Sequence, residues 1–205
     1  METTYPFVTF LTAILPHWIH GWDRPRRDLL LHPYPDHLFQ VLWFLKYHSI
    51  ARFSVLMHLA GVDYPSRAQR VALVYTLLSV SLNTRIRLRT TYDELTPICS
   101  VSSLFPTADW WEREVWDMFG VHFSHHPDCR RILTDYGFDW HPLRKEFPLS
   151  GYVHVRYDDS DGRIVTAPIE MNQEYRYFDL ACPWADPSFP VDPAQRGQKP
   201  CGQPS

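Results

Sequence analysis

The chain has 205 residues, of which 45% are hydrophobic and 21% are charged, and its formal net charge is −3. This length is sufficient for one domain with a sizeable core, or for one domain followed by an extended segment. The slightly negative charge gives no electrostatic attraction to nucleic acid, and the longest apolar runs (7–15 and 71–80) are shorter than the roughly 20 residues that span a bilayer.

The first predicted unit is a compact mixed α/β domain over residues 35–120, preceded by an N-terminal extension, residues 1–34. A helix is predicted over 36–48, because Asp36 is a suitable N-cap and four apolar side chains share one face: Leu38, Val41, Leu42 and Leu45. Strands are predicted over 51–61, 70–79 and 84–90. In the first strand, alternation predicts one row of side chains on the same side: Phe53, Val55, Met57 and Leu59.

The strand over 84–90 has the clearest pattern of the three. Ile86 and Leu88 point to one side, and the other side carries Arg85, Arg87 and Arg89. Such a row of arginines is a solvated face unless an acidic partner makes it a docking face. Residues 91–108 are predicted as a loop, with a short helical turn at TYDELTP, residues 91–97.

The sequence DWWEREVWDMFG, residues 109–120, predicts a second amphipathic helix. Asp109 and Glu112 have the spacing of a capping box, and Gly120 can supply the left-handed C-terminal stop. Four residues form a stripe that we expect to pack inward: Trp111, Val115, Met118 and Phe119. The charged residues lie mostly off this stripe, which predicts an exposed charged face with Arg113 and Asp117 four residues apart. This face comprises Glu112, Arg113, Glu114 and Asp117.

Residues 121–184 form a predicted extended arm. The part up to residue 152 has no regular pattern, yet it is too rich in aromatic and aliphatic side chains for a disordered linker. Irregular backbone cannot satisfy its polar groups with regular ladders, so the arm needs a surface to lie on. Within the arm, residues 152–158 and 163–169 predict a hairpin closed near Gly162, and residues 174–180 a last extended piece. Residues 185–205 are a proline-rich tail with little apolar area.

The charged helix raises the question of catalysis or metal binding. Glu114 and Asp117 share a face, as a dinuclear metal site requires, but the sequence has no Glu-x-x-His partner helix. The sequence also lacks GxSxG, GxGxxG and GxxxxGK[ST] motifs. A free-standing metal-dependent enzyme is the alternative interpretation, with a carboxylate and three residues of HFSHHPDC: His125, His126 and Cys129.

The cysteines and the cations of the arm are less specific. The chain has four cysteines: Cys99, Cys129, Cys182 and Cys201. No two of them form a CxxC motif, which argues against an iron–sulfur cluster held by this chain alone. The cations could bind an anionic ligand, but they are more often partners of nearby acids. They are Arg130, Arg131, Arg144 and Lys145, and the acids are Asp128, Asp135, Asp139 and Glu146.

Two blocks of residues carry a resemblance to a known family. The first block comprises Glu112, Arg113, Glu114, Asp117, Met118, Phe119, His126, Arg130 and Ile132. The second reads D-Y-G-F, H-P-L-R-K and F-P-L-S-G-Y at 135–138, 141–145 and 147–152, and shorter matches lie at 61–67, 83–90, 103–112 and 174–184. These blocks resemble the 30 kDa subunit family of respiratory complex I, which comprises subunit 9 of mitochondrial NADH dehydrogenase and its counterpart in bacterial NADH-quinone oxidoreductase.

The resemblance implies a non-redox structural and assembly subunit of the quinone module, in the peripheral arm of proton-pumping NADH:ubiquinone oxidoreductase. The assembled complex uses FMN, iron–sulfur clusters, NADH and ubiquinone, and this chain is expected to bind none of them. The implied partners are other complex I subunits, chiefly the hydrogenase-derived large quinone-module subunit and neighbouring iron–sulfur subunits. The implied location is the matrix side of the mitochondrial inner membrane, or alternatively the cytoplasmic side of a bacterial membrane.

The resemblance also implies which residues order the arm and meet the partner, none of them catalytic, cofactor-binding or metal-binding. These are Trp111, Glu112, Arg113, Glu114, Asp117, His126, Arg130, Asp135, Tyr136, His141, Arg144, Lys145 and Tyr152. Two positions depart from the family pattern, with Cys129 for the usual Leu and Trp140 for the usual Gly. Trp140 is strained if the backbone there is left-handed, and unstrained if the side chain is open to solvent.

Overall fold

The computed structural model describes residues 4–25, 29–174, 176 and 178. The chain divides into two units, residues 1–149 and 150–205, and each is described here by itself. In the described part of the chain, no helix has the length and apolar character needed to cross a membrane.

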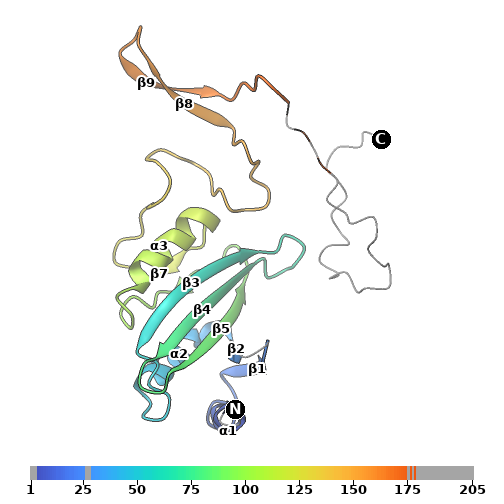
Figure 1. The fold of residues 1–205 in the computed structure, drawn as a ribbon, viewed down its shortest axis with the longest axis vertical. Coiled ribbons are helices and arrows are strands. Elements are labelled where there is room, and N and C mark those ends of the chain that lie inside the picture. Colours follow the sequence, from blue (N-terminus) through green and yellow to red (C-terminus); the bar gives the residue numbers. More distant parts are fainter. Residues whose placement is uncertain (1–3, 26–28, 175, 177, 179–205) are drawn as a thin grey trace. The chain divides into compact units, whose positions relative to one another are not determined.

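The first unit is built on a five-stranded sheet with the order β1-β2-β5-β4-β3 (Figure 1). Its strands are β1 (Ile19–Asp23), β2 (Leu29–Pro33), β3 (Val55–Asp63), β4 (Val71–Ser79) and β5 (Thr84–Tyr92). The last three form an antiparallel meander, whereas β2 pairs with β5 in parallel, with Leu30 opposite Arg87. A short parallel pair, β6 (Ile98–Cys99) and β7 (Phe123–Ser124), lies outside this sheet.

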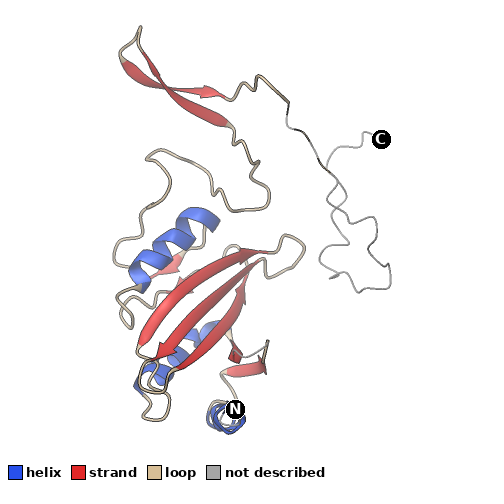
Figure 2. Ribbon diagram, in the orientation of Figure 1, coloured by secondary structure: helices blue, strands red, loops and turns tan. Residues whose placement is uncertain are grey.

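The helices of the first unit are α1 (Thr4–Ile14), α2 (Leu38–Tyr47) and α3 (Ala108–Phe119), with a 3-10 turn η1 (Pro35–His37) before α2. The predicted apolar face of α2 is confirmed, because Leu38, Val41, Leu42 and Leu45 are all buried in the core. Helix α3 lies along β3 (Figure 2), and Val115 is part of the same core. The mixed α/β domain predicted from the sequence is therefore confirmed.

The N-terminal boundary of this domain was predicted too late in the chain. Residues 19–33 supply two strands of the sheet, and Val8 and Leu11 of α1 are buried in the core. The described residues up to 34, namely 4–25 and 29–34, are thus part of the domain and not a separate extension. The partner of β2 is β5, more than fifty residues later in the chain, so no local pattern could indicate the pairing.

Two local predictions in this domain are wrong. Asp36 lies inside η1, and His37 stands at the N-cap of α2 without a side-chain cap hydrogen bond. Residues 91–97 contain no helical turn, because β5 continues to Tyr92 and the Asp93 carboxylate then accepts a hydrogen bond from the Thr96 N–H at 3.0 Å. A short polar side chain here bends the backbone directly.

The strands β4 and β5 match their predictions, with Ile86 and Leu88 buried. In β3 the register shifts between Leu56 and His58, so Leu56 and Leu59 are buried while Val55 and Met57 are exposed. The predicted row that included these last two residues is therefore wrong. A bulge inserts one residue and moves every side chain before it to the opposite face.

The described part of the second unit contains the predicted hairpin, with β8 (Val153–Asp158) and β9 (Arg163–Pro168) in antiparallel pairing. Gly162 in the turn has a φ of 59°, which suits glycine. The predicted extended piece, 174–180, lies mostly outside the described residues, and the predicted tail, 185–205, lies wholly outside them.

Candidate functional site

Helix α3 is the element around which the predicted site residues gather. It ends where Gly120, with a φ of 75°, donates its N–H to the Trp116 carbonyl at 2.8 Å. The predicted left-handed stop is thus confirmed. The inward stripe is confirmed as well, because Val115 and Met118 are buried and the partly buried Trp111 and Phe119 pack against the core.

Glu112 does not form the predicted capping box. Thr107 stands at the N-cap without a side-chain cap hydrogen bond. The Glu112 carboxylate is fully buried and accepts hydrogen bonds from the Ser100 hydroxyl at 2.6 Å and the Val101 N–H at 2.7 Å. Burial raises the pKa of Glu112 to about 7, although these two hydrogen bonds oppose the effect.

His126 fastens the beginning of the arm to the first turn of α3. Its Nε2 atom lies 3.3 Å from the Asp109 carbonyl oxygen and 3.3 Å from the Asp109 carboxylate. The same atom lies 3.7 Å from the Glu112 carboxylate, and the His126 side chain is fully buried. A histidine with these neighbours is placed to pack and donate a hydrogen bond within the chain.

Asp117 holds the next segment of the arm. Its buried carboxylate accepts the N–H groups of Ile132, Leu133 and Thr134 at 3.3, 2.8 and 2.8 Å. It also accepts the Thr134 hydroxyl at 2.5 Å and Arg131 at 2.9 Å. Burial alone would raise the pKa of Asp117, but the hydrogen bonds from Thr134, Leu133 and Ile132 outweigh it and lower the pKa to about 2.

Arg113 adds a second hold on the same segment. Its guanidinium donates to the carbonyls of Arg130 and Arg131 at 3.2 and 3.5 Å, and it lies over the ring of Trp110. The predicted exposed charged face is therefore wrong for Glu112, Arg113 and Asp117, which are buried, while Glu114 is half-buried. Asp117 pairs with Arg131 instead of Arg113.

The C-terminal end of α3 receives the following part of the arm. His141 Nδ1 donates to the Asp117 carbonyl at 3.0 Å, and the Leu143 N–H donates to the Met118 carbonyl at 3.1 Å. Arg144 Nε donates to the Phe119 carbonyl at 2.7 Å, and its guanidinium pairs with Glu94. The last carbonyls of a helix have no partner within the helix, so the arm acts as their cap.

A third contact joins the arm to the end of β3. Asp63 forms a two-pronged ion pair with Arg70, with distances of 2.6 and 3.0 Å, and accepts the Lys145 N–H at 2.9 Å. Arg70 also contacts Glu146 at 3.0 Å. Burial alone would raise the pKa of Asp63, but the bonds from Arg70 and Lys145 lower it. We refer to all hydrogen bonds between residues 63–119 and residues 126–146 as the arm clamp.

The sequence analysis missed three groups of the arm clamp: Asp63, Arg70 and Glu94. The first two flank the turn of the β3–β4 hairpin, and the matched segment at 61–67 includes Asp63. An acid at the end of a strand followed by an arginine at the start of the next strand is a signal for such a pair. Glu94 gives no comparable signal, because its partner lies fifty residues later.

Several predicted site residues lie outside the arm clamp. Only the backbone carbonyl of Arg130 takes part in the arm clamp; its side chain is exposed and pairs with Asp128 at 3.0 Å. Asp135, Tyr136 and the side chain of Lys145 are exposed as well, and Tyr152 is exposed in the second unit. Trp111 makes an edge-to-face contact with His58. The structure thus brings together Arg113, Asp117, His126, His141 and Arg144 around one helix and leaves the other arm residues at the surface.

The two departures from the family pattern cause no backbone strain. The non-glycine residues with positive φ in the described chain are Arg52, Asn83 and His125, so Trp140 is not left-handed. Its side chain is 46% exposed, which agrees with a position open to solvent. Cys129 is half-buried, and burial raises the pKa of its thiol.

The arm clamp offers little room for chemistry. The crevice among Asp63, Arg70, Glu94, Phe119 and Arg144 leaves no space for a water molecule. Among the described residues, no group of three or more His, Cys, Asp or Glu side chains could hold a metal ion. The geometry fits a structural role, in which side chains of α3 and of the end of β3 hold an irregular segment of the chain in place.

Comparison with known proteins gives a consistent family. The family model described as "Respiratory-chain NADH dehydrogenase, 30 Kd subunit" matches residues 31–153. The chain is 67% identical over 184 residues to "NADH dehydrogenase [ubiquinone] iron-sulfur protein 3" of Beta trigyna, covering 90% of this chain and 96% of that protein. It is 62% identical over 178 residues to the protein of the same name from Marchantia polymorpha, covering 87% and 91%. It is 51% identical over 178 residues to "NADH-ubiquinone oxidoreductase subunit 9" of Prototheca wickerhamii, covering 87% and 93%.

Two solved structures have a similar fold. A chain in the structure of the membrane-bound sulfane sulfur reductase, an archaeal respiratory membrane complex, has a TM-score of 0.62 and 27% identity, covering 72% of this chain and 87% of that chain. A trypsin-resistant fragment of Nqo5 has a TM-score of 0.52 and 24% identity, covering 60% of this chain and 98% of that chain.

Proposed function

Because the chain belongs to the respiratory-chain NADH dehydrogenase 30 kDa subunit family, we propose that it is a structural and assembly subunit of NADH:ubiquinone oxidoreductase. In this role it lies in the quinone module of the peripheral arm. It contributes no reacting group to electron transfer from NADH to quinone. The FMN, the iron–sulfur clusters and the nucleotide site belong to other subunits.

The observation that carries this proposal is the use of the charged groups on α3 and of Arg144 at its C-terminal end. Asp117 is buried and hydrogen-bonded to the arm, and Arg113 and Arg144 donate to backbone carbonyls. A catalytic acid or base must reach a substrate proton, whereas these groups fasten one part of the chain to another. A chain of the membrane-bound sulfane sulfur reductase complex has a similar fold, although that complex is named for a different substrate. A fold that is shared by complexes with different substrates supports a structural role for this chain.

The arm presents the surface that a partner would cover. The side chains of Leu133, Tyr136, Leu143 and Leu149 are all more than half exposed, and Tyr136 is 91% exposed. The arm clamp fixes the backbone beneath the first three, so these apolar groups lose little further entropy on binding. The partner is the large hydrogenase-derived subunit of the quinone module, with iron–sulfur subunits beside it. The complex lies in the mitochondrial inner membrane, with this chain on the matrix side.

Arg144→Ala tests the proposal. The substitution removes the cap on the Phe119 carbonyl and the partner of Glu94, so the arm should detach while the sheet stays folded. Native gels of membranes solubilised in mild detergent should show less assembled complex, with unchanged NADH:quinone turnover per assembled complex. The matched control is Arg85→Ala, which removes an exposed arginine at the beginning of β5. Normal amounts of a complex that reduces quinone much more slowly would show that the arm takes part in the reaction.

A further inference from the structure

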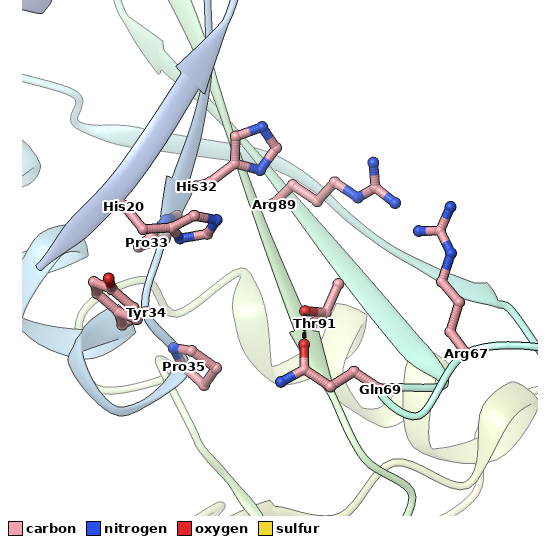
Figure 3. A pocket seen from close by; sticks show the side chains of 9 residues that line it. All are labelled: His20, His32, Pro33, Tyr34, Pro35, Arg67, Gln69, Arg89 and Thr91. Carbon is pink, nitrogen blue, oxygen red and sulfur yellow. Dashed lines mark hydrogen bonds between the residues drawn. The ribbon is translucent and has the colours of Figure 1, made fainter.

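A second feature of the first unit lies outside the arm clamp. It is a pocket of about 390 Å³ with walls from three places in the sheet (Figure 3). The β1–β2 pair and the residues after it supply His20, His32, Pro33, Tyr34 and Pro35; the β3–β4 turn supplies Arg67 and Gln69; and β5 supplies Arg89 and Thr91. The volume falls within the range of small-molecule sites.

The pocket carries positive charge from two arginines, Arg67 and Arg89, and its described lining contains no aspartate or glutamate. A carboxylate close to the lining is that of Asp23, which lies 2.9 Å from the Nε2 atom of the lining residue His32. The guanidinium carbons of Arg67 and Arg89 lie 4.2 and 5.5 Å from the ring centroid of Tyr64. Figure 3 shows the two guanidinium groups turned toward each other. Two like charges gathered on one ring repel each other, and an anion between them would relieve this repulsion.

The rest of the lining includes the aromatic rings of His20, His32 and Tyr34. The ring centroid of His20 lies 5.2 Å from the ring centroid of Tyr34 and 5.5 Å from that of His32. Thr91 donates a hydrogen bond to Gln69, which fixes two further polar groups at the floor. The parallel strands β2 and β5 both end at this pocket.

We propose that this pocket binds a phosphate-bearing ligand. The phosphate lies between Arg67 and Arg89, whose planar groups each match two phosphate oxygens. The organic part of the ligand lies against the rings of His20 and Tyr34. The site goes beyond the structural role proposed above and does not depend on it. A phosphate of this kind comes either from a soluble metabolite or from the headgroup of a membrane lipid.

Binding to the full purified chain tests this proposal. Calorimetric titrations at fixed ionic strength use inorganic phosphate and adenosine monophosphate as probes. Sedimentation with phosphatidylcholine vesicles, with and without phosphatidic acid, tests the lipid source. Saturable binding of the soluble probes supports a metabolite site, and sedimentation that requires phosphatidic acid supports a headgroup site.

Variants locate the binding. Arg67→Gln and Arg89→Gln should each weaken it by about tenfold or more, while Arg89→Lys, which keeps the charge but loses the planar fork, should give an intermediate loss. The matched control is Arg85→Gln, which removes the same charge from the same strand outside the pocket. Thermal unfolding confirms that each variant is folded. Absence of saturable binding to all three probes overturns the proposal, and so does an equal loss in Arg85→Gln, which would indicate a general charge effect.

Discussion

Replacing Asp117 by Asn should release the arm from α3. Asparagine keeps the size of the side chain but has no negative charge and only one acceptor oxygen. The carboxylate now accepts three backbone N–H groups, a hydroxyl and Arg131, and an amide cannot accept all five. A pKa lowered from 3.8 to about 2 corresponds to roughly 2–3 kcal/mol of stabilisation of the charged form.

Limited trypsin digestion measures this release, because the arm contains cleavage sites at Arg130, Arg131, Arg144 and Lys145. Cleavage that follows transient opening reports the population of the open form. A loss of roughly 2–3 kcal/mol should therefore raise the cleavage rate within residues 130–145 by about one to two orders of magnitude. Asp139→Asn is the matched control, since it removes the same charge from an exposed position in the same segment.

At low pH the parent chain and the Asp117→Asn chain should have the same free energy of unfolding. The folded pKa of Asp117 is lower than the unfolded value, so its contribution is complete above about pH 5 and is lost as the pH falls toward 2. The two free energies of unfolding, measured in urea, should converge over this range. Equal trypsin cleavage of the two chains at neutral pH would refute the reasoning, because it would mean that the carboxylate does not hold the arm.

Three further predictions concern other parts of the chain. Burial raises the pKa of Glu112 to about 7, so the folded chain keeps a proton on Glu112 that the unfolded chain loses above about pH 4.5. The free energy of unfolding should therefore fall as the pH rises from 4.5 to 7. Glu112→Gln should abolish this pH dependence, as measured by urea unfolding at a series of pH values. Gly61→Ala should destabilise the fold by about 1–3 kcal/mol in thermal unfolding, because the added Cβ would lie 2.7 Å from the Phe119 ring, whereas an alanine in place of the exposed Ser66 should cost little. Truncation after Ala185 should leave the amount of complex on native gels unchanged, since residues 186–205 have little apolar area to offset the entropy of ordering; a clear loss would show that the tail docks.

Local pattern was sufficient for strands β4 and β5, helices α2 and α3, and the hairpin. In β5, Ile86 and Leu88 alternate with arginines, and the structure buries the two apolar residues. The stop of α3 at Gly120 and the turn at Gly162 followed from the freedom of glycine to adopt positive φ. In each case the deciding interaction lies within a few residues of the pattern, so the sequence contains the whole signal.

The burial of the charged side of α3 could not be predicted in this way. Glu112 and Asp117 lie off the apolar stripe, so periodicity places them in solvent. What covers Asp117 is a segment that begins fourteen residues later, with Arg131, and what covers Glu112 includes Ser100 before the helix. The register shift in β3 near Met57 could not be predicted for a related reason, because a bulge depends on how β3 pairs with β4. Long-range contacts decide these positions, and the local pattern of a single sequence does not display them.

The cap on α3 has a consequence for the order of events during synthesis. The carbonyls of the helix end belong to residues 117–119, while their donors belong to His141, Leu143 and Arg144. A ribosome makes the chain from the N-terminus, so the helix end is exposed before its donors exist. The meander of β3, β4 and β5 has all its partners by residue 92 and can form first. The last turn of α3 and the arm then become ordered together, as one late step.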